Sequence, residues 1–232
     1  MEADLKAARW LSWGTLRRLL HPLWFRYISR SAGLTTTSVE GFELQILPSV
    51  FHPKYSGSSV IFARFISKLA LNGKTLLEMG CGSGIVALCA ARAGALVVAV
   101  DINPDAVECT RRNAERAGLR LDVRQSDVYD RVPERFDVIA WNPPFFPGTP
   151  KDPAGAAFYA GDHYQALDKF AAGARAHLNP GGRIYTILSS DADLEALKGL
   201  FERHALTWRV AALEKWLFGE RMLIIEHIGS RA

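Results

Sequence analysis

The chain has 232 residues, of which 49% are hydrophobic and 22% charged, and its formal net charge is +4 at pH 7. These values suit a folded domain with a sizeable core and exclude an intrinsically disordered chain. No stretch is apolar over the roughly 20 residues that a membrane-spanning helix needs, and the start, MEADLKAARW, lacks the pattern of a signal peptide. We therefore expect a cytoplasmic protein without a transmembrane segment.

The net charge is concentrated in the first 39 residues, which hold six basic and two acidic side chains. Apolar residues recur there at helical spacing between Trp13 and Leu23, with arginines beside them. We expect residues 1–45 to form a basic, aromatic, helical extension ahead of a domain over 46–232. Three interpretations stay open: the extension packs on the domain, binds RNA or another polyanion, or lies on an anionic membrane surface.

The next segment, GFELQILPSVFHPKYSG, predicts a strand and a loop that lead to a helix over about residues 58–71. A small hydroxyl side chain at the start of that helix would satisfy a first-turn N–H group. We expect one of three serines to act as this cap: Ser56, Ser58 or Ser59.

Residues 74–84, KTLLEMGCGSG, combine a short apolar strand with glycines at alternate positions. Gly80, Gly82 and Gly84 let the backbone turn sharply and approach a ligand. The apolar segment IVALCAARAG that follows predicts a buried helix, whose first N–H groups lack partners. The pattern indicates a nucleotide-type site, but Ile85 stands where a dinucleotide fingerprint needs its third glycine, which argues against NAD.

Two further strands end in acidic residues. ALVVAV ends at Asp101, whose carboxylate could accept hydrogen bonds from the two hydroxyls of a ribose, and a helix over Pro104–Ala117 follows with Asn103 as its cap. LDVRQSD ends at Asp127, whose carboxylate could accept from an adenine amino group. Three strand ends therefore converge on one ligand.

The segment DVIAWNPPFF predicts a strand that runs into a stiff turn. Pro143 and Pro144 fix φ and lack N–H groups, so the Asn142 side chain and a proline carbonyl remain as acceptors. Such a pair could hold both N–H groups of a planar NH₂ while Phe145 stacks on it and Phe146 walls the pocket. The alternative is an ordinary loop after a strand.

The remaining chain alternates in the same way. A loop rich in glycine and proline is expected to move or to recognise substrate. It precedes a helix over about 164–177, the strand RIYTILSS and a helix over 191–204. The segments LTWRVAALEKW and ERMLIIEHI then predict two final strands joined as a hairpin. We expect a parallel sheet with this antiparallel hairpin at one end.

In combination, these motifs resemble those of the class I S-adenosylmethionine-dependent methyltransferases. The NPPF form of the fourth motif is similar to the subgroup that methylates nitrogen, which includes release-factor glutamine, adenine N6 and rRNA guanine N2 methyltransferases. The family implies an α/β Rossmann-like sheet of seven strands, mostly parallel, in the order 3-2-1-4-5-7-6, with strand 7 antiparallel and helices on both faces. The Pro-Arg-Pro and Thr-Glu residues common in the release-factor enzymes are absent here.

The resemblance also assigns roles to residues of this chain. Those expected to bind the cofactor are Glu78, Gly80, Cys81, Gly82, Gly84, Asp101, Ile102, Asp127, Val128 and Asn142. Those expected to be catalytic are Asn142, Pro143, Pro144 and Phe145.

The function implied is transfer of a methyl group from S-adenosyl-L-methionine to a planar amide or amino nitrogen, with S-adenosyl-L-homocysteine as product. The basic extension favours a macromolecular acceptor, a protein glutamine or an RNA or DNA base. A small-molecule N-methyltransferase and a catalytically silent cofactor-binding partner protein remain as alternatives. The six histidines and three cysteines show no ligand spacing, so no metal is expected.

Overall fold

The computed structural model describes residues 34–152, 155–216 and 219–228, so the helix predicted between Trp13 and Leu23 lies outside the described residues. The described chain begins with an antiparallel hairpin of β1 (Thr35–Val39) and β2 (Phe42–Ile46). Glu40 and Gly41 both have positive φ, as a tight two-residue turn requires. The expected boundary at residue 45 therefore falls inside β2, and the described part of the expected helical extension is a β-hairpin.

A sheet of seven strands forms the centre of the molecule, in the order β5-β4-β3-β6-β7-β9-β8. Neighbours from β5 to β7 pair in parallel, and β9 is antiparallel to both β7 and β8. Numbered along the chain within this sheet, the order is 3-2-1-4-5-7-6, so the predicted fold is confirmed. The strands are β3 (Thr75–Met79), β4 (Leu96–Asp101), β5 (Asp122–Gln125), β6 (Phe136–Trp141), β7 (Leu178–Ser189), β8 (Arg209–Lys215) and β9 (Arg221–His227).

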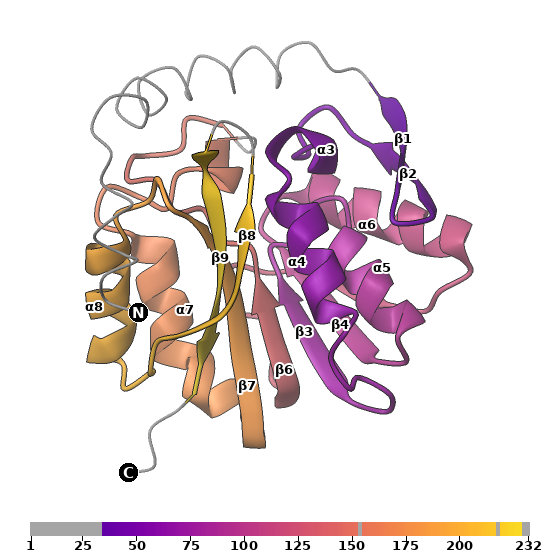
Figure 1. The fold of residues 1–232 in the computed structure, drawn as a ribbon. Helices are drawn as coiled ribbons and strands as arrows, with labels where there is room; N and C mark the ends of the chain where they lie inside the picture. Colours follow the sequence, from indigo (N-terminus) through magenta and orange to yellow (C-terminus); the bar gives the residue numbers. More distant parts are fainter. Residues whose placement is uncertain (1–33, 153–154, 217–218, 229–232) are drawn as a thin grey trace.

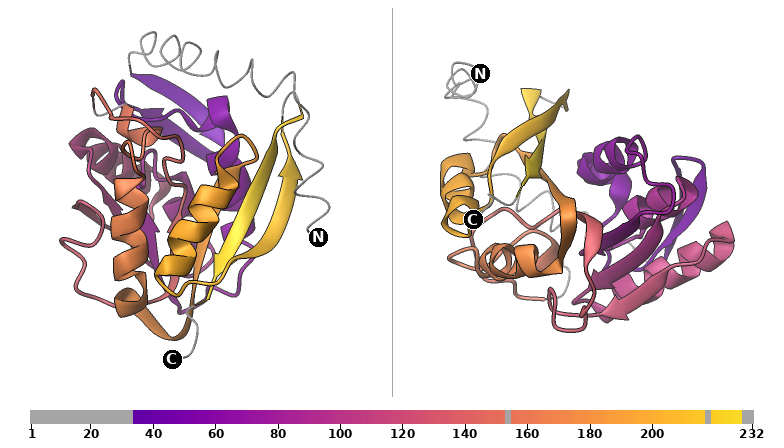
Figure 2. Two further views of the ribbon diagram at one scale, coloured as in Figure 1. Left: turned by 90° about the vertical axis from the view of Figure 1, so that its left-hand side faces the viewer. Right: turned by 90° about the horizontal axis from the view of Figure 1, so that it is seen from below.

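Helices cover both faces of the sheet, as the views from the side and from below show (Figures 1 and 2). Successive strand residues point to opposite faces, so Leu76 joins one hydrophobic core and Leu77 the other. One face carries α4 (Ser58–Ile66), α5 (Ile85–Arg92) and α6 (Pro104–Ala117); the other carries α7 (Gln165–Ala174) and α8 (Leu194–Arg203). A short helix, α3 (Pro53–Ser56), precedes α4. In the described ranges, no helix combines the length and the apolar character needed to cross a membrane.

N-caps were predicted for two helices, and the structure confirms one of them and shows the other to be wrong. The Asn103 side chain accepts a hydrogen bond from Asp105 N at 3.0 Å, so Asn103 caps α6 as predicted. The N-cap of α4 is instead Gly57, with φ of 67°, and no side chain caps that helix. The serine cap predicted there is wrong, because the chain enters α4 directly from the left-handed end of α3.

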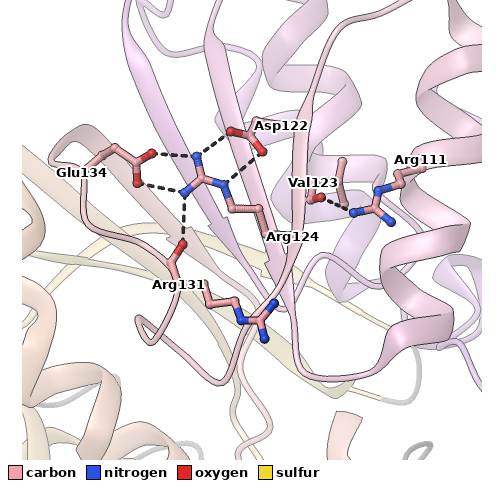
Figure 3. A network of polar contacts seen from close by, with 6 residues as sticks. All are labelled: Arg111, Asp122, Val123, Arg124, Arg131 and Glu134. Carbon is pink, nitrogen blue, oxygen red and sulfur yellow. Dashed lines mark hydrogen bonds and ion pairs between the residues drawn. The ribbon is translucent and has the colours of Figure 1, made fainter.

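The edge strand β5 is held by two arginines (Figure 3). Arg111 of α6 donates a hydrogen bond to the Val123 carbonyl at 2.7 Å. Arg124 binds three acceptors, which are the carboxylates of Asp122 and Glu134 and the carbonyl of Arg131. The Arg111 contact ties the strand to α6, and the Arg124 contacts tie it to the loop that follows. That loop carries residues 126–128 to the carboxyl edge of the sheet.

Candidate functional site

A cleft of about 930 Å³ opens at the carboxyl ends of β3, β4, β5 and β6. Every residue predicted for the site lines this cleft except Gly84. Gly84 is the N-cap of α5, with φ of 82°, and a Cβ there would lie 2.9 Å from the Thr110 side chain of α6. The structure thus gives Gly84 a packing role between two helices, outside the cleft lining.

The glycine loop and Asp101 form one polar unit. Gly80 and Gly82 have φ of 65° and 52°, the left-handed region that glycine adopts at no steric cost. Gly82 N donates to one oxygen of Asp101 and Asn103 N to the other, each at 2.9 Å. Burial raises the pKa of Asp101, while these backbone hydrogen bonds act in the opposite direction. The carboxylate therefore fixes the shape of the loop and also faces the cleft.

Glu78 is the last residue but one of β3 and is only 4% exposed. Its carboxylate accepts a hydrogen bond from Ala87 N at 2.8 Å, in the first turn of α5. Burial raises the pKa of Glu78 well above its ordinary value, the hydrogen bond from Ala87 lowers it, and the nearby charge of Asp101 raises it further. Glu78 therefore joins the strand to the helix across the glycine loop and contributes an acid to the cleft.

The loop after β5 brings Asp127 and Val128 to the cleft. Val128 has φ of 51°, and the Ser126 hydroxyl holds this turn by donating to the Val128 carbonyl at 2.9 Å. Lys169 of α7 donates to Asp127 Oδ2 at 2.7 Å and forms a second ion pair with Asp130. Sequence reasoning missed Lys169, because it lies 42 residues from Asp127 and only the fold brings the two together.

Asn142 follows β6, and both N–H groups of its side chain are engaged. Asn142 Nδ2 donates to the hydroxyl of Ser58 at 3.1 Å and to that of Ser59 at 3.0 Å. Among the described residues, no donor contacts Asn142 Oδ1. The amide thus has its donors turned to α4 and its oxygen left as an acceptor at the cleft that Asn142 lines.

Aromatic side chains dominate the part of the cleft around Asn142. The loop after it doubles back on itself through paired residues, Phe146 with Tyr159 and Gly148 with Gly161. Trp216, from the turn between β8 and β9, lies so close to the start of α4 that a Cβ on Gly57 would come within 2.3 Å of its ring. The aromatic residues that line the cleft are Phe51, Trp141, Phe145, Phe146, Phe158, Tyr159 and Trp216.

A seven-stranded, mostly parallel α/β sheet with a glycine loop and acidic residues at the strand ends defines a Rossmann-like fold. The sequence profile of one family, described as "Methyltransferase small domain", matches residues 43–212. That is more than half of the chain, and the protein belongs to this family.

Proteins similar in sequence to this chain include glutamine and rRNA methyltransferases. A candidate protein N5-glutamine methyltransferase of Methanocaldococcus jannaschii is 31% identical over 158 residues, which cover 66% of this chain and 78% of that protein. The release factor glutamine methyltransferase of Cereibacter sphaeroides is 37% identical over 153 residues, covering 60% of this chain and 54% of the relative.

A solved structure shares the fold. The 16S rRNA N2 methyltransferase of T. thermophilus, in complex with AdoMet and guanosine, superposes with a TM-score of 0.60 at 24% identity. The match covers 84% of this chain and 50% of that protein. The chain therefore spans about half the length of this enzyme and of the Cereibacter sphaeroides relative.

Proposed function

We propose that this protein is an S-adenosylmethionine-dependent N-methyltransferase that acts on a planar amide or amino nitrogen of a macromolecule. The observation that carries the proposal is the orientation of Asn142, whose NH₂ group is bound by two serines while its oxygen remains an acceptor. An oxygen acceptor beside a proline-stiffened turn suits an incoming N–H donor. Membership of a methyltransferase family supplies the reaction class.

The cleft fits the expected cofactor, which when bound supplies an electrophilic methyl group. A Cβ on Gly82 would meet no atom within 4 Å, so the backbone of the loop is open for a ligand to approach. The Asp101 oxygens each accept one backbone N–H, and a carboxylate oxygen has a second lone pair with which to accept from a ribose hydroxyl. Lys169 occupies Asp127 Oδ2, which leaves Oδ1 to accept from an adenine amino group.

The part of the cleft around Asn142, where the methyl acceptor would bind, needs little acid–base chemistry. Its main task is to align a nitrogen lone pair with the methyl group and to exclude water. Asn142 Oδ1 and the Pro143 carbonyl would each accept one N–H of the acceptor. Phe145, whose ring centroid lies 4.8 Å from that of Phe146, would stack on the flat group. Both N–H groups held in this way direct the lone pair of the nitrogen out of conjugation and toward the methyl group.

The class of acceptor is inferred from the three similar proteins described above, which are named for protein glutamine and for rRNA. A macromolecular acceptor, either a protein glutamine or a nucleic-acid base, is therefore the favoured substrate. All three cysteines are free and buried, in keeping with a reduced cytoplasmic setting.

The experiment that tests the proposal follows a methyl label from S-adenosylmethionine into cell extract. The purified full chain is incubated with both, and the protein, nucleic-acid and small-molecule fractions are counted, with and without prior ribonuclease treatment. Label in protein that resists ribonuclease indicates an amide acceptor, and label lost with ribonuclease indicates a base. Label confined to the small-molecule fraction would overturn the macromolecular assignment, and no transfer to any fraction would overturn the proposed activity.

A further inference from the structure

We propose that Ser58 and Ser59 are positioning residues that select the orientation of the Asn142 amide, and hence the kind of group the cleft accepts. This inference rests on the proposed function, because it concerns the same acceptor site. The two hydroxyls lie 3.1 Å and 3.0 Å from Asn142 Nδ2, one for each N–H group of the amide.

An asparagine side chain has nearly the same shape in its two flipped orientations but opposite hydrogen-bonding character. With the oxygen toward the cleft, it accepts from an NH₂ substrate. With the nitrogen toward the cleft, it would place two donors against the donors of that substrate. In the structure both serine hydroxyls accept from Nδ2, so each N–H group of the amide has a partner within the protein and Oδ1 is the atom left for a substrate N–H.

The fold places these serines with little freedom. Gly57 has φ of 67° and joins α3 directly to α4, so Ser58 and Ser59 occupy the first turn of α4. Ser58 is 5% exposed, and the Trp216 ring lies over the backbone at Gly57. Since Gly57 is the N-cap and α4 has no side-chain cap, the hydroxyls serve the long-range contact to Asn142 in place of the helix end.

The contact links segments that are 83 and 84 residues apart in the sequence. Both segments line the same cleft, and each brings an aromatic residue to it, Phe51 ahead of α3 and Phe145 after Asn142. Loss of the serines would free the amide to rotate while the glycine loop and Asp101 stay as they are. The effect should therefore fall on methyl transfer and spare the cofactor.

The test compares Ser59→Ala, the double variant Ser58→Ala/Ser59→Ala, and Ser59→Thr, which keeps a hydroxyl. We expect the double variant to lose about tenfold or more in the initial rate of label transfer from methyl-labelled S-adenosylmethionine to cell extract. Ser59→Ala should lose less, and Ser59→Thr should transfer at close to the wild-type rate. Calorimetric affinity for S-adenosylmethionine should be unchanged in all three. Ser67→Ala is the matched control, because its hydroxyl donates to the Arg64 carbonyl at the other end of α4, away from Asn142.

A double-mutant cycle separates this inference from the proposed function. The serine substitutions should cause no further loss in an Asn142→Ala background, because they act through that amide. A further loss in that background, or a fully active double serine variant beside an inactive Asn142→Ala, overturns the positioning role and leaves the proposed function intact. A fully active Asn142→Ala overturns the proposed mechanism itself. Should the double variant fail to fold, the comparison of Ser59→Ala with Ser59→Thr still decides the question.

Discussion

The two halves of the cleft are built in different ways. The half formed by the glycine loop, Asp101 and Asp127 consists of consecutive strand, turn and helix segments, and most of its hydrogen bonds involve backbone groups. The half around Asn142 is assembled from side chains of α4, the loop after β6 and the turn between β8 and β9. A site built from backbone groups suits a ligand that a whole family shares, because backbone groups do not change when side chains are substituted. A site built from side chains can come to bind a different methyl acceptor when those side chains are substituted.

If the two halves of the cleft act independently, a substitution in the half that positions the methyl acceptor should leave cofactor binding intact, and the converse should also hold. The largest expected effect is that of Asn142→Ala, which should lower the rate of methyl transfer by about a hundredfold or more, because misplacement alone can cost that much. Binding of S-adenosylmethionine, measured by calorimetry, should survive. Near-normal turnover in this variant would count against the mechanism.

Asp101→Ala should show the converse behaviour. The substitution removes the acceptor for Gly82 N and Asn103 N and the proposed acceptor for ribose hydroxyls. We expect the affinity for S-adenosylmethionine to fall by about ten- to a hundredfold, since hydrogen bonds to charged groups contribute ~1.5–3 kcal/mol. Calorimetric titration measures this change, with Asp105→Ala, at an exposed site on α6, as the control. Unaltered affinity would remove Asp101 from the cofactor site.

A matched pair of glycine substitutions compares the two halves directly. Gly57→Ala and Gly82→Ala both place a Cβ at positive φ, at a similar cost of ~1–2 kcal/mol. At Gly57 the new methyl group would meet the Trp216 ring, so methyl transfer should fall while the cofactor still binds. At Gly82 it would enter the open cleft, so cofactor affinity should fall. Equal losses of cofactor affinity in the two variants would show that the halves are not separate.

The smallest expected effect is the pH dependence of stability at Glu78. Burial raises the pKa of Glu78 well above its ordinary value of 4.5, so the folded protein holds a proton that the unfolded chain releases. The contribution of this residue to stability is thus fully present below pH 4.5 and is lost as pH rises toward the folded pKa.

Glu78→Gln keeps an oxygen for Ala87 N and removes this titration. Thermal melts at intervals from pH 4.5 to pH 8 should show the stability of the variant gaining on that of the wild type as pH rises. A constant difference across that range would show that Glu78 titrates as it does in the unfolded chain.

Sequence reasoning succeeded where structure is local. The cap at Asn103 and the positions of Gly80, Gly82 and Asp101 follow from short motifs in which each residue acts on near neighbours. The order of the sheet is not local, and it was implied by the family resemblance that those motifs carry. The predicted ends of helices were less accurate. The helix α4 was expected to reach about residue 71, but it ends at Ile66, because hydrogen bonds of the i to i−3 type, such as Leu69 N to Ile66 O, replace the α-helical ones from there on.

Contacts between distant segments could not be predicted. The serines at the start of α4 carry the signal of a helix cap, and nothing in the local pattern points to Asn142, some 84 residues away. Lys169 beside Asp127 and Trp216 over Gly57 likewise depend on how α7 and the last hairpin pack. Gly84 matched a motif, yet its close approach to Thr110 becomes visible only once α5 and α6 are packed.

In the proposed mechanism the cleft presents an oxygen acceptor to a flat amine beside the methyl donor. The chemical position of the transferred methyl group tests this, and it can be determined by digestion of the labelled acceptor and mass spectrometry of the fragments. We expect the methyl group to lie on the nitrogen of an amide or an amino-substituted ring. A methyl group on oxygen, carbon or sulfur would contradict it.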